Sequence, residues 1–262
     1  QYDTSGTLEG VFATVVDQTS GAVLLSETLI DATAINPRCV GIGPNPTLVY
    51  IDTSSSPYVA KSIQVDVDNP TQFKTANTLA SNVDPTNPSI DVDVYSTNVS
   101  SGSAVFAYKK NSGTNVTVGY INNEGQVGSP GLGFPGLTDI TGADATDGVA
   151  ITVDTVNTSN PTVNRIYVAY FSTASSQGII LKRLTSILTV EDTETIQATS
   201  AKIDGCSLLI RQDGDLQITY TLNATNTYNH KIRTAVYDPG SSSIISAAAD
   251  LKLSVGLASK MF

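Results

Sequence analysis

Pairs of aspartates are the residues of this sequence best suited to chemistry. Asp91 and Asp93 stand two residues apart in the segment IDVDVYS, and Asp154 ends a similar apolar run, GVAITVD. Two carboxylates on either side of a glycosidic bond can serve as general acid and as base or nucleophile. These aspartates are therefore the candidate catalytic residues of a glycosidase. Sugar sites generally contain aromatic side chains, however, and the sequence has no tryptophan and only 6% aromatic residues, so we rank a lectin-like, carbohydrate-binding role above hydrolysis.

Asp213 and Asp215 flank Gly214 in the segment RQDGDLQ, a pattern that also occurs in calcium loops. Calcium takes six to eight oxygen ligands, usually from alternating positions of a loop. Two aspartates supply too few, and Asp-Gly is a strong signal of a two-residue hairpin turn. We therefore predict an ordinary hairpin turn here.

Histidine and cysteine are scarce, which limits nucleophilic and zinc chemistry. His230 is the only histidine and lies just before a predicted strand, so we expect it in a surface loop. Cys39 and Cys206 are the only cysteines, too few for the usual zinc site. They occupy the same place in two repeats that are not neighbours, and a disulfide needs Cα atoms within about 7 Å. We expect two buried, reduced thiols, and we predict no catalytic residue, no cofactor and no metal site.

The composition excludes several classes of function. The chain has 262 residues and a formal net charge of −10, so general binding to nucleic acid is not expected. No stretch approaches the roughly 20 apolar residues of a membrane helix, and no signal peptide is recognisable. Only 15% of the residues are charged, and the abundant Ser, Thr, Asn, Gly and Val favour strands and turns over helices. Four Asn-X-Ser/Thr sequences would matter only in a secreted chain; they begin at Asn98, Asn115, Asn157 and Asn223.

A repeat of about 52 residues organises the chain. Its first landmark is an apolar residue, any residue and then tyrosine on a strand-like run, as in TLVYID, AVFAYKK, RIYVAYFS and LQITYTL. We expect the four tyrosines to be equivalent and buried between neighbouring units; they are Tyr50, Tyr108, Tyr170 and Tyr220.

A second strand that ends in a polar turn follows each tyrosine strand. Asp and Asn suit the start of such a turn because their side chains bond the backbone two residues on. The aligned turn residues are Asp17, Asp68, Asn122, Thr185 and Asp238. A weaker strand and then a short apolar run complete each unit. The apolar runs are residues 39–43, 90–96, 148–154, 206–212 and 251–256.

Tandem units of four strands are typical of a β-propeller, in which the first strand of each blade lines a central channel. We therefore predict an all-β fold, a single five-bladed β-propeller over residues 1–262 with four antiparallel strands in each blade and the short apolar runs innermost. Tandem β-sandwiches are the alternative, although these need about 100 residues each. Residues 128–137, GSPGLGFPGL, hold too much glycine and proline for a regular element and are expected to form a projecting loop.

The fifth tyrosine strand is divided between the two ends of the sequence. Residues 259–262 followed by residues 1–5 recreate the landmark as Phe262, Gln1 and Tyr2. Three explanations stay open: a ring that closes with both segments in one blade, a sequence cut from a longer repeat array, or a chance match of a short landmark.

The units NRIYVAYFSTASSQGIILKRL and GDLQITYTLNATNTYNHKIRTAVYDPGSSSI resemble the propeller repeats of bacteriophage virion proteins, above all the tail nozzle or tubular proteins of short-tailed phages. The shared features are an apolar-x-Tyr strand, a variable loop, a strand and an Asp/Asn turn. The resemblance implies a non-enzymatic structural component that binds protein partners or copies of itself in a virion or another extracellular assembly. A carbohydrate-binding propeller is the alternative hypothesis, and a glycosidase is the third.

Overall fold

The computed structural model describes the chain apart from its two ends and several internal gaps. The described residues are 10–66, 68–96, 102–111, 115–128, 136–140, 147–155, 165–172, 178–197, 202–223 and 230–250. Every helix or strand found in these ranges is a β-strand, and none of them contains a helix able to cross a membrane. The prediction of an all-β fold is therefore confirmed.

The strands form five antiparallel sheets, which we number in chain order. In the described residues the first sheet has two strands, β1 (Val11–Val16) and β2 (Val23–Asp31). The second sheet has β3 (Ala34–Ile42), β4 (Asn45–Asp52), β5 (Tyr58–Gln64) and β6 (Asn77–Val83). The third has β7 (Ile90–Ser96), β8 (Ser103–Lys109), β9 (Val116–Ile121) and β10 (Leu137–Asp139).

The last two sheets also have four strands each. The fourth sheet has β11 (Asp147–Asp154), β12 (Arg165–Ser172), β13 (Gly178–Leu184) and β14 (Val190–Gln197). The fifth has β15 (Lys202–Ile210), β16 (Leu216–Asn223), β17 (His230–Asp238) and β18 (Ser243–Asp250). In every four-stranded sheet the strands follow one another in chain order, as short hairpin connections require.

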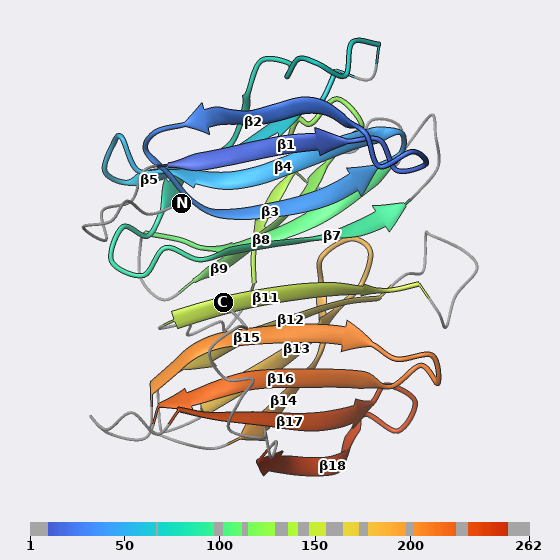
Figure 1. Cartoon of the computed structure of the whole chain (residues 1–262). Helices are drawn as coiled ribbons and strands as arrows, with labels where there is room; N and C mark the ends of the chain where they lie inside the picture. The colour runs from blue at the N-terminus through green and yellow to red at the C-terminus, as the bar shows by residue number, and fades with distance from the viewer. Residues whose placement is uncertain are drawn as a thin grey trace.

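Successive sheets stack face to face, from blue to red in Figure 1. Their first strands lie beside one another: β3 contacts β7, β7 contacts β11, and β11 contacts β15. A separate apolar cluster fills each of the four interfaces between consecutive sheets. Such a series of four-stranded antiparallel sheets, with their first strands together, is the β-propeller fold.

Burial explains why the middle strands are so apolar. Strands β8 and β9 are buried at every residue because another sheet covers each of their faces. The outer strand β14 instead alternates between half-buried and exposed residues over most of its length, as a strand with one solvated face does. A continuous apolar run therefore indicates a middle strand of a sheet, and an alternating pattern indicates an outer one.

The four repeat tyrosines are buried, with at most 2% of each exposed, as predicted. Each ring packs toward the preceding sheet: Tyr50 lies in the cluster with Val11 of β1, and Tyr108 in the cluster with Ile51 of β4. The hydroxyl of Tyr108 donates to Asn82 Oδ1 near the end of β6, at 2.7 Å. The Tyr220 hydroxyl donates to Gln197 Oε1 at the end of β14, at 3.2 Å.

The predicted turn residues are confirmed in four of the five repeats. Asn122 Oδ1, for example, accepts hydrogen bonds from the backbone N–H groups of Glu124 and Gln126. In the second repeat the turn begins at Asp66 rather than Asp68, because Asp66 Oδ1 accepts from the Asp68 N–H at 3.2 Å. The strand before it, β5, accordingly ends earlier than we predicted.

Several local expectations need correction. The projecting loop at 128–137 ends one residue early because Leu137 already begins β10, while residues 129–135 lie outside the described residues. His230 is the first residue of β17, opposite Asn223, rather than a loop residue. Cys39 is exposed instead of buried, although both thiols are free as expected. The first sheet has two of its four predicted strands here, and the segments proposed for the others lie beyond the residues described.

Candidate functional site

A row of acceptors on one face of the third sheet's first strand binds the next sheet. Side chains two residues apart on a strand share a face, and those just before and along β7 accept hydrogen bonds from alternate N–H groups of β11. The pairs are Ser89 Oγ with Val149 N–H at 2.8 Å, Asp91 Oδ2 with Ile151 N–H at 3.0 Å, and Asp93 Oδ2 with Val153 N–H at 2.9 Å. Asp91 and Asp93 therefore join the first strands of two sheets.

A bulge in β3 brings an arginine to this row. The register of β3 against β4 shifts between Ile35 and Arg38, and Asn36 within the bulge has a positive φ of 51°. The Asn36 amide donates to the carbonyl of Pro88 at 2.8 Å, which fixes the bulge against the third sheet. Bulges commonly re-aim a side chain, and here the Arg38 Nε lies 3.2 Å from Asp91 Oδ1.

Arg38 and Asp91 form the candidate site, a partly exposed ion pair at the first strands of the second and third sheets. The Arg38 side chain remains 48% exposed, and that of Asp91 22%. Burial raises the pKa of Asp91, and the Ile151 N–H and the Arg38 guanidinium only partly oppose this effect. An exposed guanidinium beside a carboxyl offers donors and acceptors together, as recognition of a polyhydroxylated ligand requires.

The remaining two candidate aspartates are held by the protein itself. Asp93 Oδ2 also accepts from the Thr152 hydroxyl at 2.8 Å, and its Oδ1 accepts from the Val94 N–H at 2.7 Å. Asp154 is 1% exposed at the end of β11, opposite Arg165. Asp91 is the one for which the exposed guanidinium of Arg38 lies within ion-pair distance.

Sequence reasoning missed Arg38. The two residues before it, Asn36 and Pro37, could have indicated the bulge, because a proline within a strand interrupts the hydrogen-bond ladder. Cys206 lies in β15, the first strand of the fifth sheet. Burial, and to a lesser extent the charge of Asp91, raises the pKa of its thiol to about 12. This thiol stays protonated at neutral pH and is a poor nucleophile.

The sequence Asp213-Gly214-Asp215 forms the hairpin turn that we predicted. The Arg211 N–H donates to the Asp215 carbonyl at 2.8 Å, and Gly214 has a positive φ of 89°. The Asp213 carboxylate accepts from the Asp215 N–H and pairs with Arg211. Both of these interactions stabilise the turn.

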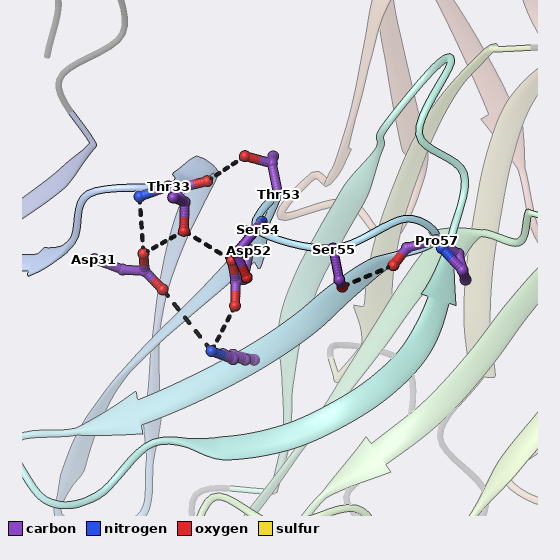
Figure 2. A network of polar contacts seen from close by, with 8 residues as sticks. Asp31, Thr33, Asp52, Thr53, Ser54, Ser55 and Pro57 are labelled. Carbon is purple, nitrogen blue, oxygen red and sulfur yellow. Dashed lines mark hydrogen bonds and ion pairs between the residues drawn. The ribbon is translucent and has the colours of Figure 1, made fainter.

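A polar network at the boundary of the first and second sheets is shown in Figure 2. Lys61 Nζ lies 2.6 Å from Asp52 Oδ2 and 3.9 Å from Asp31 Oδ2. The Thr33 hydroxyl lies 2.8 Å from one oxygen of each carboxylate and gives its single hydrogen to one of them. Thr53 donates to the Thr33 carbonyl through its hydroxyl at 2.6 Å. The network ties the end of β2 to β4 and β5.

This network predicts a specific sensitivity to acid. Burial alone would raise the pKa of Asp52, but hydrogen bonds from Lys61, Ser54 and Thr33 bring it well below its usual value. A carboxyl whose pKa is lowered by folding stabilises the fold above its unfolded pKa of about 3.9 and loses this effect as the pH falls. Between pH 7 and pH 3, the free energy of unfolding should therefore fall less in Lys61→Met than in the native chain. Urea denaturation at the two pH values measures this difference. Parallel pH profiles would contradict this assignment.

No family model and no curated protein matches the chain. Its fold is similar to that of an arginine-to-alanine triple mutant of AofleA from Arthrobotrys oligospora, at 13% identity and a TM-score of 0.61, covering 94% of this chain and 67% of that one. AofleA itself gives 12% identity and a TM-score of 0.58, with 94% and 66% covered. An exo-beta-1,3-galactanase from Phanerochaete chrysosporium, solved with beta-1,3-galactotriose, gives 16% identity and a TM-score of 0.54.

The alignment with the galactanase covers 91% of this chain and 53% of that one. This chain therefore spans about half of the galactanase and two thirds of AofleA. At these identities the likeness shows the fold alone.

The galactanase overturns one conclusion drawn from the sequence. From the resemblance to virion repeats we expected a chain without enzymatic activity, but an exo-beta-1,3-galactanase has a similar fold, so that expectation is wrong. None of the proteins just named is a phage tail protein, and the resemblance to virion repeats stays a prediction.

Proposed function

We propose that the protein is a carbohydrate-binding β-propeller and that the ligand contacts the Arg38–Asp91 pair. The observation that carries the proposal is the half-exposed guanidinium of Arg38 beside a carboxyl at the first strands of the second and third sheets. Planar guanidinium groups and carboxyls bind vicinal hydroxyls through paired donors and acceptors. The shared fold with a galactanase supports a sugar as the ligand class.

We further propose that the domain has five blades in a closed ring, of which the structure describes four complete blades and half of another. A ring would bring all the first strands around one axis and set the Arg38–Asp91 pair beside a central channel. This geometry concentrates binding residues from different blades at one place, as propellers commonly do.

The test is binding to immobilised oligosaccharides, with beta-1,3-galactan fragments as the first probes. We expect Arg38→Ala to weaken binding at least about tenfold, or about 1.4 kcal/mol. The matched control is Arg211→Ala, which also removes an exposed arginine paired with an aspartate and should bind as the native chain does. A native chain that binds no glycan, or an Arg38→Ala variant with full affinity, would overturn the proposal.

Hydrolysis is the second candidate because Asp91 has a raised pKa. A raised pKa is the direction of shift that the general acid of a glycosidase needs. Incubating the same oligosaccharides with the native chain and with Asp91→Asn separates the two functions: binding without released sugar supports the lectin-like role, whereas release that depends on Asp91 supports the enzyme. The asparagine keeps an oxygen that can accept from Ile151, so the strand contact survives.

A further inference from the structure

The Arg38 guanidinium keeps donors that can reach a ligand. Its Nε donates to Asp91 Oδ1 at 3.2 Å, and its Nη1 donates to the carbonyl of Pro37, also at 3.2 Å. Its Nη2 has no hydrogen-bond partner among the described residues, and 48% of the side chain is exposed. A planar guanidinium binds a carboxylate through two parallel hydrogen bonds. By its donors alone, Arg38 would therefore prefer an acidic sugar to a neutral one.

Asp91 opposes this preference because its charge balances that of Arg38. Its Oδ1 accepts from the Arg38 Nε, and its Oδ2 accepts from the N–H of Ile151 at 3.0 Å. This one carboxylate therefore connects β3, β7 and β11, and 22% of its side chain is exposed beside the guanidinium. A ligand carboxylate that reached Arg38 would also meet the like charge of Asp91, and like charges repel strongly at such short range.

A second carboxylate lies on the same face of β7. Asp93 stands two residues after Asp91, and side chains two residues apart on a strand share a face. Its three donors are the Thr152 hydroxyl and the Val153 N–H on Oδ2 and the Val94 N–H on Oδ1. These donors are neutral, so they do not cancel the negative charge of the carboxylate. The surroundings of Arg38 thus include two acidic groups, in a chain whose formal net charge is −10.

We propose that Asp91 selects the charge of the ligand: with its carboxylate beside Arg38, the site binds neutral sugars and rejects sugars that carry a carboxylate. Arg38 supplies donors to the sugar hydroxyls, and Asp91 is the residue that determines specificity. The proposal rests on the sugar-binding function proposed above and adds the class of sugar to it.

The surroundings of Asp91 make this selection depend on pH. Among the described residues, the charged or titratable groups nearest to it are Arg38 on β3, Asp93 on β7 and the Cys206 thiol on β15, and β11 contributes backbone N–H groups. Burial raises the pKa of Asp91. As the pH falls toward this pKa, Asp91 takes up a proton and no longer balances the charge of Arg38. Acidic sugars should therefore bind better in acid.

The experiment compares two ligands of the same size: a beta-1,3-galactan fragment, and the same fragment with its terminal CH₂OH group oxidised to a carboxylate. Titration calorimetry at pH 7.5 and low salt measures both affinities, since salt would screen the effect of charge. We expect the native chain to bind the neutral fragment at least about tenfold more tightly than the acidic one. Asp91→Asn should invert this ratio, because its amide oxygen can still accept from Ile151 while Arg38 loses its negative partner.

The matched control is Asp213→Asn, which removes the same charge from an aspartate that pairs with the exposed Arg211; it should keep the native ratio of the two affinities. In the native chain the preference for the neutral fragment should shrink between pH 7.5 and pH 5, where an exposed carboxyl of pKa about 4 is still largely ionised. In Asp91→Asn the ratio should change less with pH, because the titrating group is gone.

The outcomes separate this proposal from the function on which it rests. Equal or tighter binding of the acidic fragment by the native chain would overturn the selection by Asp91 and leave the sugar-binding function standing. The selection would also be wrong if Asp91→Asn kept the native ratio, or lost both ligands, with its fold retained, or if the preference for the neutral fragment grew in acid. A native chain that binds neither fragment would overturn both proposals.

Discussion

Replacing Tyr108 with alanine should lower the free energy of unfolding by about 3–5 kcal/mol. The side chain is 1% exposed and lies in the cluster between the second and third sheets. Its ring stacks on Phe106 with centroids 6.1 Å apart, and its hydroxyl donates to Asn82 Oδ1 at 2.7 Å. Tyr108→Ala therefore opens a cavity at the boundary of two sheets and leaves a polar partner behind.

Tyr108→Phe separates these two effects. It keeps the ring and removes only the hydroxyl, so it should cost about 1 kcal/mol. Urea denaturation of the native chain and both variants measures the two differences. A cost below about 1 kcal/mol for Tyr108→Ala would show that the boundary between the sheets repacks around the missing ring, and it would contradict the role assigned to the repeat tyrosines.

The tyrosines were predictable because the same position in each repeat must fill the same space between two sheets. Each second strand packs against the preceding sheet, so an apolar-x-Tyr pattern puts the large ring toward that sheet every time. The hydroxyl then reaches the end of that sheet's last strand, where Asn82 and Gln197 accept it. A single sequence with several repeats shows this recurrence by itself.

The candidate site was harder to predict because it depends on an exception to the repeat. Asp91 was recognised from its place in a first strand. Asp91 and Asp93, however, both accept hydrogen bonds from the backbone of β11, and a sequence pattern does not distinguish this structural role from a catalytic one. Arg38 reaches Asp91 through the bulge at Asn36 in the preceding sheet. The pairing of residues 53 positions apart follows from the stacking of the sheets, not from either local sequence.

Cys39 was misjudged for a related reason. In the repeat alignment it occupies an inner, apolar run, and inner residues of complete sheets are covered by the preceding sheet. Cys39 is nevertheless exposed, and it lines a pocket together with Ala13 and Val15 of β1. Whether an inner residue is covered depends on the sheet that packs in front of it, and local sequence carries no information about that neighbour.

The second large effect concerns the ion pair between Lys109 and Asp84, which joins β8 to the segment after β6. Only 6% of the Lys109 side chain and 10% of the Asp84 side chain are exposed. Burial alone would raise the pKa of Asp84, but the bond from Lys109 and the Thr86 N–H bring it below its usual value. The carboxylate is therefore charged in the folded protein and depends on Lys109 for its compensation.

Lys109→Met should destabilise the fold by about 3–5 kcal/mol at neutral pH, because it leaves a buried charge without its partner. The control is Lys110→Met on the next residue, where Lys110 pairs with the 42% exposed Asp139; such a pair contributes about 1 kcal/mol or less.

Adding Asp84→Asn to Lys109→Met should recover much of the loss, since the uncompensated charge is then gone. The deficit of Lys109→Met should also shrink toward pH 3, where a carboxyl without its cation takes up a proton first. Urea denaturation of the native chain and the three variants at both pH values measures these differences. A Lys109→Met deficit that is no larger than that of Lys110→Met, or that grows in acid, would contradict the buried ion pair.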